Sequence, residues 1–135
     1  MSSRELTYLE KIARTIWWRT GQPELSYPEN EQVLWLGYAM LALTVRTNVT
    51  NENVHDAWVV WSLDDSIRNE KPIHRSSIPY AALIHEVQEL DAEYRDAIRA
   101  VAADLAQAPI DWVFDKALRA KYPQAWKQEQ TNDHE

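Results

Sequence analysis

Residues 87–105, VQELDAEYRDAIRAVAADL, show the clearest periodicity in the chain. Their apolar side chains recur every three or four residues, which places them on one face of an α-helix. The repeating positions are Val87, Leu90, Tyr94, Ala97, Ile98, Val101 and Leu105. On the opposite, exposed side, Asp91 and Arg95 are one turn apart, in the order that favours an ion pair. The stretch therefore predicts one long amphipathic helix packed against a core.

A loop is expected immediately before this helix. Residues 68–79 have no apolar periodicity and contain two prolines, Pro72 and Pro79. Because proline suits the first position of a helix, Pro79 is expected to open a short helical turn that ends near Leu83. The long helix should follow this turn directly.

Two helices are expected in the first third of the chain. The first covers residues 3–19, with a capping box formed by Ser2 and Glu5 and with Gly21 ending it in the left-handed conformation. The second covers residues 26–47 and is apolar around nearly its whole circumference. That distribution predicts burial on most sides, and therefore a central position in the fold.

A third helix is expected to begin in the Asn- and Thr-rich stretch 48–53, since these residues favour helix caps. Its apolar face carries Val54, Ala57, Trp58 and Trp61. A last helix opens at Pro109. The pattern predicts an all-α fold: a compact bundle of four to five helices with one long loop before the fourth. We expect one domain over residues 1–126 and a flexible tail over residues 127–135.

Composition excludes several classes of protein. The chain has 135 residues, a net charge of −7 and no cysteine. The acidic balance argues against binding nucleic acid through phosphate neutralisation, and the absence of cysteine removes disulfides, thiolate metal sites and cysteine nucleophiles. The longest uncharged apolar run, residues 33–45, is too short to cross a bilayer. We therefore expect a cytoplasmic protein that binds neither membrane nor nucleic acid.

Motifs for cofactors, metals and catalysis are also missing. With only Gly21 and Gly37, the chain cannot form a phosphate-binding glycine loop. His85 and Glu89 are one helical turn apart, but no further metal ligand accompanies them in the sequence. Catalysis would require a cleft with carboxylates or histidines of shifted pKa, which no local pattern indicates. We predict no cofactor, no metal site and no enzymatic activity.

The third helix and the loop after it form the best candidate for a recognition site. Its predicted ligand-binding residues are Trp58, Trp61, Arg68, Lys71, His74, Arg75 and Tyr80. Aromatic surfaces beside cations suit a planar anionic ligand such as a nucleotide. The alternative is structural, since tryptophans at this spacing are commonly core residues and a basic loop is commonly solvated. In the same way, His55 fits a polar anchor at the start of the helix better than a catalytic group.

These residues resemble the RyR domain, the small helical module named for ryanodine receptors and also found in bacterial and phage proteins. The matching positions, within residues 53–101, are Asn53, Val54, His55, Trp58, His74, Ile78, Pro79, Tyr80, Leu83, Glu89 and Asp91. The chain is also similar to an uncharacterised helical family of actinobacteria and their phages, through the sequence HDAW at residues 55–58 and the turn at Pro79. The second resemblance implies no activity, but it implies a bacterial or phage-infected cell.

Two functional hypotheses remain open at this point. The first is a non-enzymatic module that binds a small ligand, which could be an anion derived from a nucleotide. The second is a protein interaction domain, which could be a phage accessory protein that acts on a host factor. Exposed aromatic anchors such as Trp17, Trp18 or Trp126 would favour the second hypothesis.

Overall fold

The computed structural model describes residues 5–21 and 26–122, and this part of the chain contains helices and no strand. The α-helices are α1 (Tyr8–Arg19), α2 (Gln32–Thr44), α3 (Asn51–Arg68), α4 (His85–Gln88), α5 (Ala92–Leu105) and α6 (Ile110–Lys121). Single 3₁₀ turns are η1 (Glu29–Glu31), η2 (Arg46–Asn48), η3 (Tyr80–Ala82) and η4 (Glu89–Asp91). The predicted all-α bundle with a long loop before the fourth helix is confirmed.

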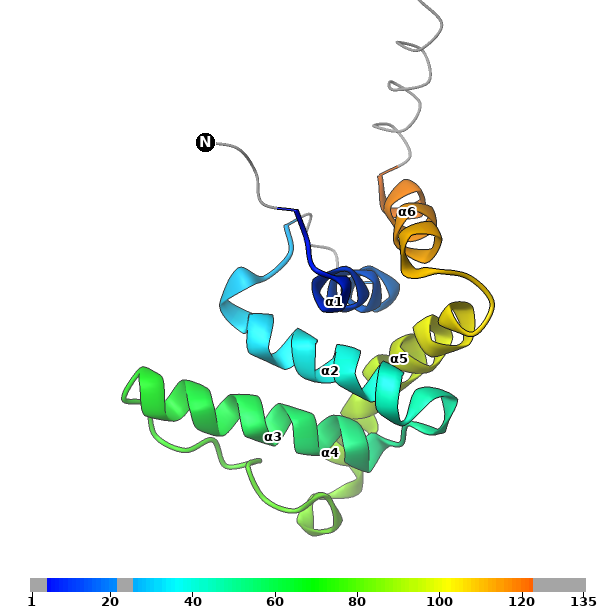
Figure 1. The fold of residues 1–135 in the computed structure, drawn as a ribbon. Coiled ribbons are helices and arrows are strands. Elements are labelled where there is room, and N and C mark those ends of the chain that lie inside the picture. The colour runs from blue at the N-terminus through cyan, green and yellow to red at the C-terminus, as the bar shows by residue number, and fades with distance from the viewer. Residues whose placement is uncertain (1–4, 22–25, 123–135) are drawn as a thin grey trace, which may run out of the picture.

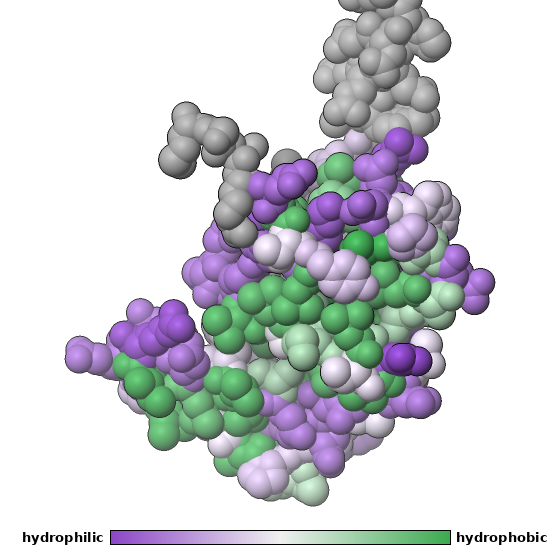
Figure 2. Space-filling model, in the orientation of Figure 1, coloured by the Kyte–Doolittle hydropathy of each residue, from purple (hydrophilic) through white to green (hydrophobic). Residues whose placement is uncertain are grey.

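Helix α2 lies at the centre of the fold, as predicted. It contacts α1, α3 and α5, while α6 packs against α1 on the side away from α2 (Figure 1). Most of its circumference is buried or partly buried, and Val33 and Met40, which are seven residues apart and 43% and 48% exposed, mark the side that faces solvent. Figure 2 shows the resulting hydrophobic surface over α2 and over the far end of α3.

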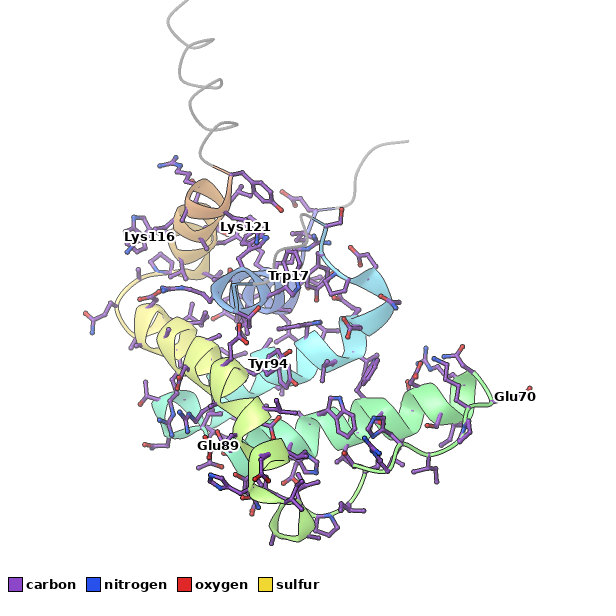
Figure 3. The ribbon with its side chains drawn as sticks, turned by 180° about the vertical axis from the view of Figure 1, so that it is seen from behind. Trp17, Glu70, Glu89, Tyr94, Lys116 and Lys121 are labelled. Carbon is purple, nitrogen blue, oxygen red and sulfur yellow. The ribbon has the colours of Figure 1, made fainter. Side chains whose placement is uncertain are left out.

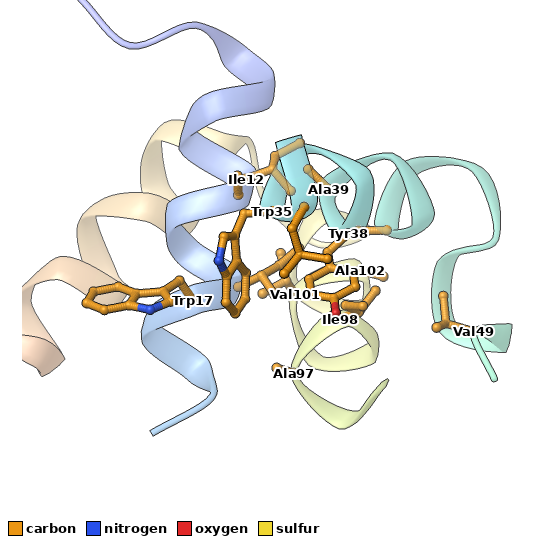
Figure 4. Packing of buried hydrophobic residues seen from close by; sticks show 14 of the residues in the cluster. Ile12, Trp17, Trp35, Tyr38, Ala39, Val49, Ala97, Ile98, Val101 and Ala102 are labelled. Carbon is orange, nitrogen blue, oxygen red and sulfur yellow. The ribbon is translucent and has the colours of Figure 1, made fainter. Parts of the chain in front are cut away.

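The main core fills the space between α1, α2 and α5 (Figure 4). Ile12 and Ile16 from α1 and Ile98 from α5 are completely buried there. Tyr38 and Trp35 from α2 meet edge to face, with ring centroids 5.2 Å apart. These aromatic side chains continue the core toward α3, where the candidate site lies.

The first helix begins later than predicted. Its capping box is formed by Thr7 and Glu10, whose backbone and side-chain groups bond reciprocally at 3.0 and 3.2 Å. The predicted capping residue Ser2 lies outside the described residues. Ser2 and Thr7 both begin a Ser/Thr-x-x-Glu pattern. The pattern at Thr7 directly precedes the helical turn that carries Ile12 into the core. Gly21 has φ of +70°, as predicted for the end of this helix.

The long helix predicted over residues 87–105 is interrupted. Helix α4 ends at Gln88, the 3₁₀ turn η4 follows, and α5 begins at Ala92. A 3₁₀ turn has three residues per turn instead of 3.6, so it rotates Asp91 relative to the helix that follows. As a result, the predicted Asp91–Arg95 ion pair is absent among the described residues: Arg95 pairs with Asp96 at 3.0 Å.

The predicted loop after α3 is also present. Helix α3 begins with a capping box between Thr50 and Asn53, and the chain from residue 69 to residue 79 runs back along it without helical structure (Figure 1). The hydroxyl of Ser66 donates to the Pro72 carbonyl oxygen, and the Ser77 hydroxyl donates to that of Ser62. The expected turn after Pro79 is η3.

Two further expectations concern membranes and the C-terminal end. None of the described helices combines the length and the apolar character needed to span a bilayer. The tail predicted over residues 127–135 lies outside the described residues, as does Trp126.

Candidate functional site

A pocket of about 290 Å³ lies between α2, α3, the loop after α3 and the η4–α5 segment. We call it the Asp91 pocket. Its lining residues are Tyr38, His55, Trp58, His74, Ser76, Val87, Leu90, Asp91 and Tyr94. Figure 3, seen from behind, shows Tyr94 on α5 directed toward α2 and α3. Apolar and aromatic walls with a few convergent polar groups are typical of small-molecule sites.

Asp91 is the acidic residue of this pocket. Burial raises the pKa of its carboxyl group to about 6, while the nearby His55 acts in the opposite direction with a smaller effect. The described part of the chain supplies neither an ion pair nor a hydrogen bond to this carboxyl group. A carboxylate held out of water without a partner is electrostatically unfavourable. A ligand could supply the missing partner.

Two histidines contribute the other ionisable nitrogen atoms. His55 is only 3% exposed, and its Nε2 lies 2.6 Å from the Ile78 carbonyl oxygen. Because a carbonyl only accepts, Nε2 carries a proton, and Nδ1 is an acceptor when the ring is neutral. The Nδ1 of His74 accepts the backbone N–H of Ser76 at 3.0 Å, so the proton of its neutral ring lies on Nε2.

Aromatic rings form the remaining walls. Trp58 stacks on His55 with ring centroids 5.8 Å apart, and it meets His74 edge to face at 5.1 Å. Tyr94 lies 5.8 Å from Tyr38. Burial raises the pKa of Tyr38 well above its ordinary value, and the charges of Asp91 and Glu31 raise it further. Tyr38 therefore remains neutral at physiological pH.

A second hollow of about 270 Å³ adjoins the first, because Tyr38, Trp58 and Tyr94 line both. Its acidic residue is Glu31. The indole N–H of Trp35 is buried beside it and has no hydrogen-bond partner among the described residues. Tyr38, Trp58 and Tyr94 thus line two adjoining hollows, one of which contains the carboxyl group of Asp91 and the other that of Glu31.

The predicted ligand-binding residues lie in different environments. Trp58 and His74 line the Asp91 pocket. Trp61 packs against the core, and Tyr80 lies beside His55 with ring centroids 6.1 Å apart, but it lines a separate shallow hollow. The structure therefore brings together only part of the predicted set.

The predicted cationic residues lie outside the pocket lining. Arg68 pairs with Asp64 at 3.0 Å, and Lys71 pairs with Asp65 at 3.3 Å. Arg75 is an exposed loop residue. Arg68 and Lys71 follow the tryptophans closely in the sequence, but in the structure they form ion pairs with acidic residues of α3 itself.

Sequence reasoning missed Tyr38, Asp91 and Tyr94 as site residues and treated His55 as an anchor. One signal could have identified Asp91. It follows Val87 by four residues and precedes Tyr94 by three, so it belongs to the apolar stripe and not to the exposed side where the predicted ion pair with Arg95 placed it. A carboxyl group in a stripe that faces the core requires a compensating partner.

A further hollow, on the other side of α1, is a weaker candidate. It measures about 350 Å³ and lies between α1 and α6, where Arg19 and Asp104 pair with each other. Lys121, a further lining residue, lies over the ring of Trp17. Each cation of this hollow has a contact within the chain: Arg19 pairs with Asp104, and Lys116 and Lys121 lie over the rings of Trp112 and Trp17.

No group of three histidine, aspartate or glutamate side chains suited to a metal ion occurs in residues 5–21 and 26–122. The pair singled out in the sequence, His85 and Glu89, is exposed on the surface with 3.8 Å between Nε2 and Oε1.

Comparisons with known proteins complete the description of the site. No curated protein and no solved structure matches the chain significantly. One family model, described as a domain of unknown function (DUF7701), matches residues 7–103. That range extends from the beginning of α1 almost to the end of α5 and includes every residue that lines the Asp91 pocket. Because the match covers more than half of the chain, the protein belongs to this family, DUF7701.

Proposed function

We propose that this chain is a non-enzymatic module that binds a small organic ligand in the Asp91 pocket. The observation that carries the proposal is a half-buried carboxyl group without a partner, held between aromatic rings from three helices. Maintaining such a group lowers the stability of the fold, so a ligand is its best physical explanation. The neutral rings offer stacking surfaces for a planar ligand.

A nucleotide-derived ligand, as suggested by the sequence, finds partial support. A base could stack on Trp58 or Tyr94, and its amino or imino groups could donate to Asp91. The phosphate groups are harder to accommodate, because Arg68 and Lys71 are paired elsewhere. His74, which lines the pocket, and the adjacent Arg75 are the residues left to contact the phosphate groups.

We expect a bound ligand to raise the melting temperature of the wild-type chain, and Trp58→Ala to abolish that increase. A ligand at one hundred times its Kd stabilises the folded state by about 2.7 kcal/mol. Trp112→Ala is the matched control, since Trp112 is an exposed tryptophan on α6, outside the pocket. The measurement is a thermal shift against nucleotides, cyclic dinucleotides, nucleosides and small aromatic amines. If millimolar ligand of every class leaves the melting temperature unchanged, the proposal fails.

The same experiment separates a binding module from an enzyme. A carboxyl group with a pKa of about 6 beside two histidines meets the general requirements for acid–base catalysis. We propose binding because Ser76, the serine among the described lining residues, contacts His74 through its backbone N–H and not through its hydroxyl group. Incubation of each stabilising ligand with the protein, followed by mass spectrometry, should return it unchanged. A protein-dependent product that Asp91→Asn abolishes would favour catalysis.

Protein interaction remains the second candidate, and exposed apolar residues on α3 favour it. Val60, Leu63 and Ile67 recur at helical spacing, and Ile67 is 80% exposed. Trp17, one of the aromatic anchors considered from the sequence, is buried, and Trp18 is partly buried against Phe114. The α3 stripe is therefore the better surface for this hypothesis.

If this stripe binds a protein, Ile67→Lys should reduce complex formation by at least about tenfold, because a charge would enter an apolar contact. Asp91→Asn should leave the complex intact, since Asp91 lies in the pocket and not on the stripe. Sedimentation velocity and affinity capture from cell extract would measure both variants. Complexes that Asp91→Asn removes and Ile67→Lys does not would contradict this assignment.

A further inference from the structure

The charge of the ligand can be inferred from the residues that surround Asp91. Of the described residues that line its pocket, none is lysine or arginine. The other ionisable residues that line the pocket are His55 on α3, His74 in the loop, Tyr38 on α2 and Tyr94 on α5. The pocket therefore has a carboxyl group but no permanent positive charge to balance it.

The hydrogen-bonding groups of the pocket also favour a ligand that is positively charged. The Asp91 carboxylate only accepts, and His55 has used its Nε2 proton on the Ile78 carbonyl oxygen. The hollow on the other side of Tyr38, Trp58 and Tyr94 contains a second carboxyl group, Glu31, and likewise no lysine or arginine among its described lining residues. Neither hollow therefore offers a lysine or arginine donor among its described lining residues.

The aromatic walls suit the same class of ligand. The faces of tryptophan and tyrosine rings attract cations, and the attraction strengthens where water is partly excluded. Trp58, Tyr38 and Tyr94 line the pocket together with the carboxyl group, and burial, which raises the pKa of Tyr38 well above its ordinary value, keeps that ring neutral. A carboxylate among several electron-rich rings is complementary to an ammonium group that carries an apolar body.

We propose that the Asp91 pocket binds an organic ammonium ion, with the charged nitrogen at the Asp91 carboxylate and the apolar part against Trp58, Tyr94, Val87 and Leu90. This inference rests on the proposed function and specifies the ligand class of the same site. It departs from the anionic ligand suggested by the sequence, because the cations behind that suggestion do not line the pocket. The volume of about 290 Å³ limits the ligand to a small amine.

Three probes that differ mainly in their head group provide the test: phenethylammonium, 2-phenylethanol and 3-phenylpropanoate. Backbone amide and indole N–H signals of the wild-type chain are followed by NMR at pH 7.5 during titration with each probe. We expect the ammonium ion to bind about tenfold more tightly than the alcohol and the carboxylate to bind least, because one charge-assisted contact distinguishes them. Asp91→Asn should reduce the affinity for the ammonium ion to that for the alcohol and leave the alcohol unchanged.

The outcomes distinguish this inference from the proposed function. Equal binding of all three probes, or preferred binding of 3-phenylpropanoate or a nucleotide, overturns the ammonium assignment but retains a ligand pocket. Absence of binding by these probes and by the nucleotides overturns both. The wild-type series alone decides the preference for a cation, so the result does not depend on a variant. Asp56→Asn, a change at an exposed position of α3, controls for the loss of one negative charge.

Discussion

Replacing Ile98 by alanine is expected to lower the free energy of unfolding by about 3–4 kcal/mol, because it removes buried methyl and methylene groups and leaves a cavity. Ile98 is completely buried in the core between α1, α2 and α5. Domains of this size are commonly stable by only about 5–15 kcal/mol. The variant should therefore lose a large fraction of its stability and weaken the attachment of α5, which carries Tyr94.

The matched control is Ile67→Ala, which makes the same chemical change at an exposed position on α3. Its effect should stay within about 0.5 kcal/mol. Urea denaturation followed by tryptophan fluorescence measures both variants. An Ile98→Ala cost below about 1 kcal/mol, or equal costs for the two variants, would mean that α5 is not packed as described.

Replacing Asp91 by asparagine is expected to stabilise the free protein at pH 8. In the wild-type chain the pKa of this carboxyl group is raised from 3.8 to about 6, since burial disfavours the charged form. The folded state therefore holds this proton more tightly than the unfolded state, so stability falls as the pH rises from about 3.8 to about 6 and stays lowered above pH 6. The shift sets an upper limit of about 3 kcal/mol, and solvent at the pocket mouth reduces the expected gain to about 1–2 kcal/mol.

The advantage of Asp91→Asn should depend on pH. It should be fully present above about pH 6 and decrease between pH 6 and pH 4, because the wild-type carboxyl group is protonated in both states only below about 3.8. Urea denaturation at pH 4.5, 6 and 8 measures this dependence, and Asp56→Asn should show no comparable gain. A variant that is less stable than the wild type at pH 8 would indicate that Asp91 has a stabilising partner and no need of a ligand.

The helical pattern predicted most of the fold because it depends on local sequence. Proline, glycine and capping residues define where α3, the loop and α6 begin, and the apolar character of residues 33–45 predicted the central position of α2. The predicted helix over residues 87–105 was wrong at η4. Apolar spacing of three and four residues is satisfied both by one continuous helix and by two helices joined through a tight turn.

The site was less predictable because it depends on contacts between distant segments. Trp58 and His74 were expected in a site and both line the Asp91 pocket, since a turn of helix and a neighbouring loop stay close in space. Tyr38 comes from a helix that the sequence assigned wholly to the core. Arg68 and Lys71 have acidic residues of α3 within reach, and the resulting ion pairs direct them away from the tryptophans.

The most direct test of the account is the titration of the Asp91 carboxyl group itself. The carbon chemical shift of this group can be followed by NMR from pH 3 to pH 9, without and with phenethylammonium. We expect a midpoint near 6 in the free protein and a lower midpoint when the ammonium ion is bound, because the cation favours the carboxylate. A midpoint near 4 that does not respond to the ammonium ion would contradict it, since Asp91 would then be an ordinary hydrated carboxylate.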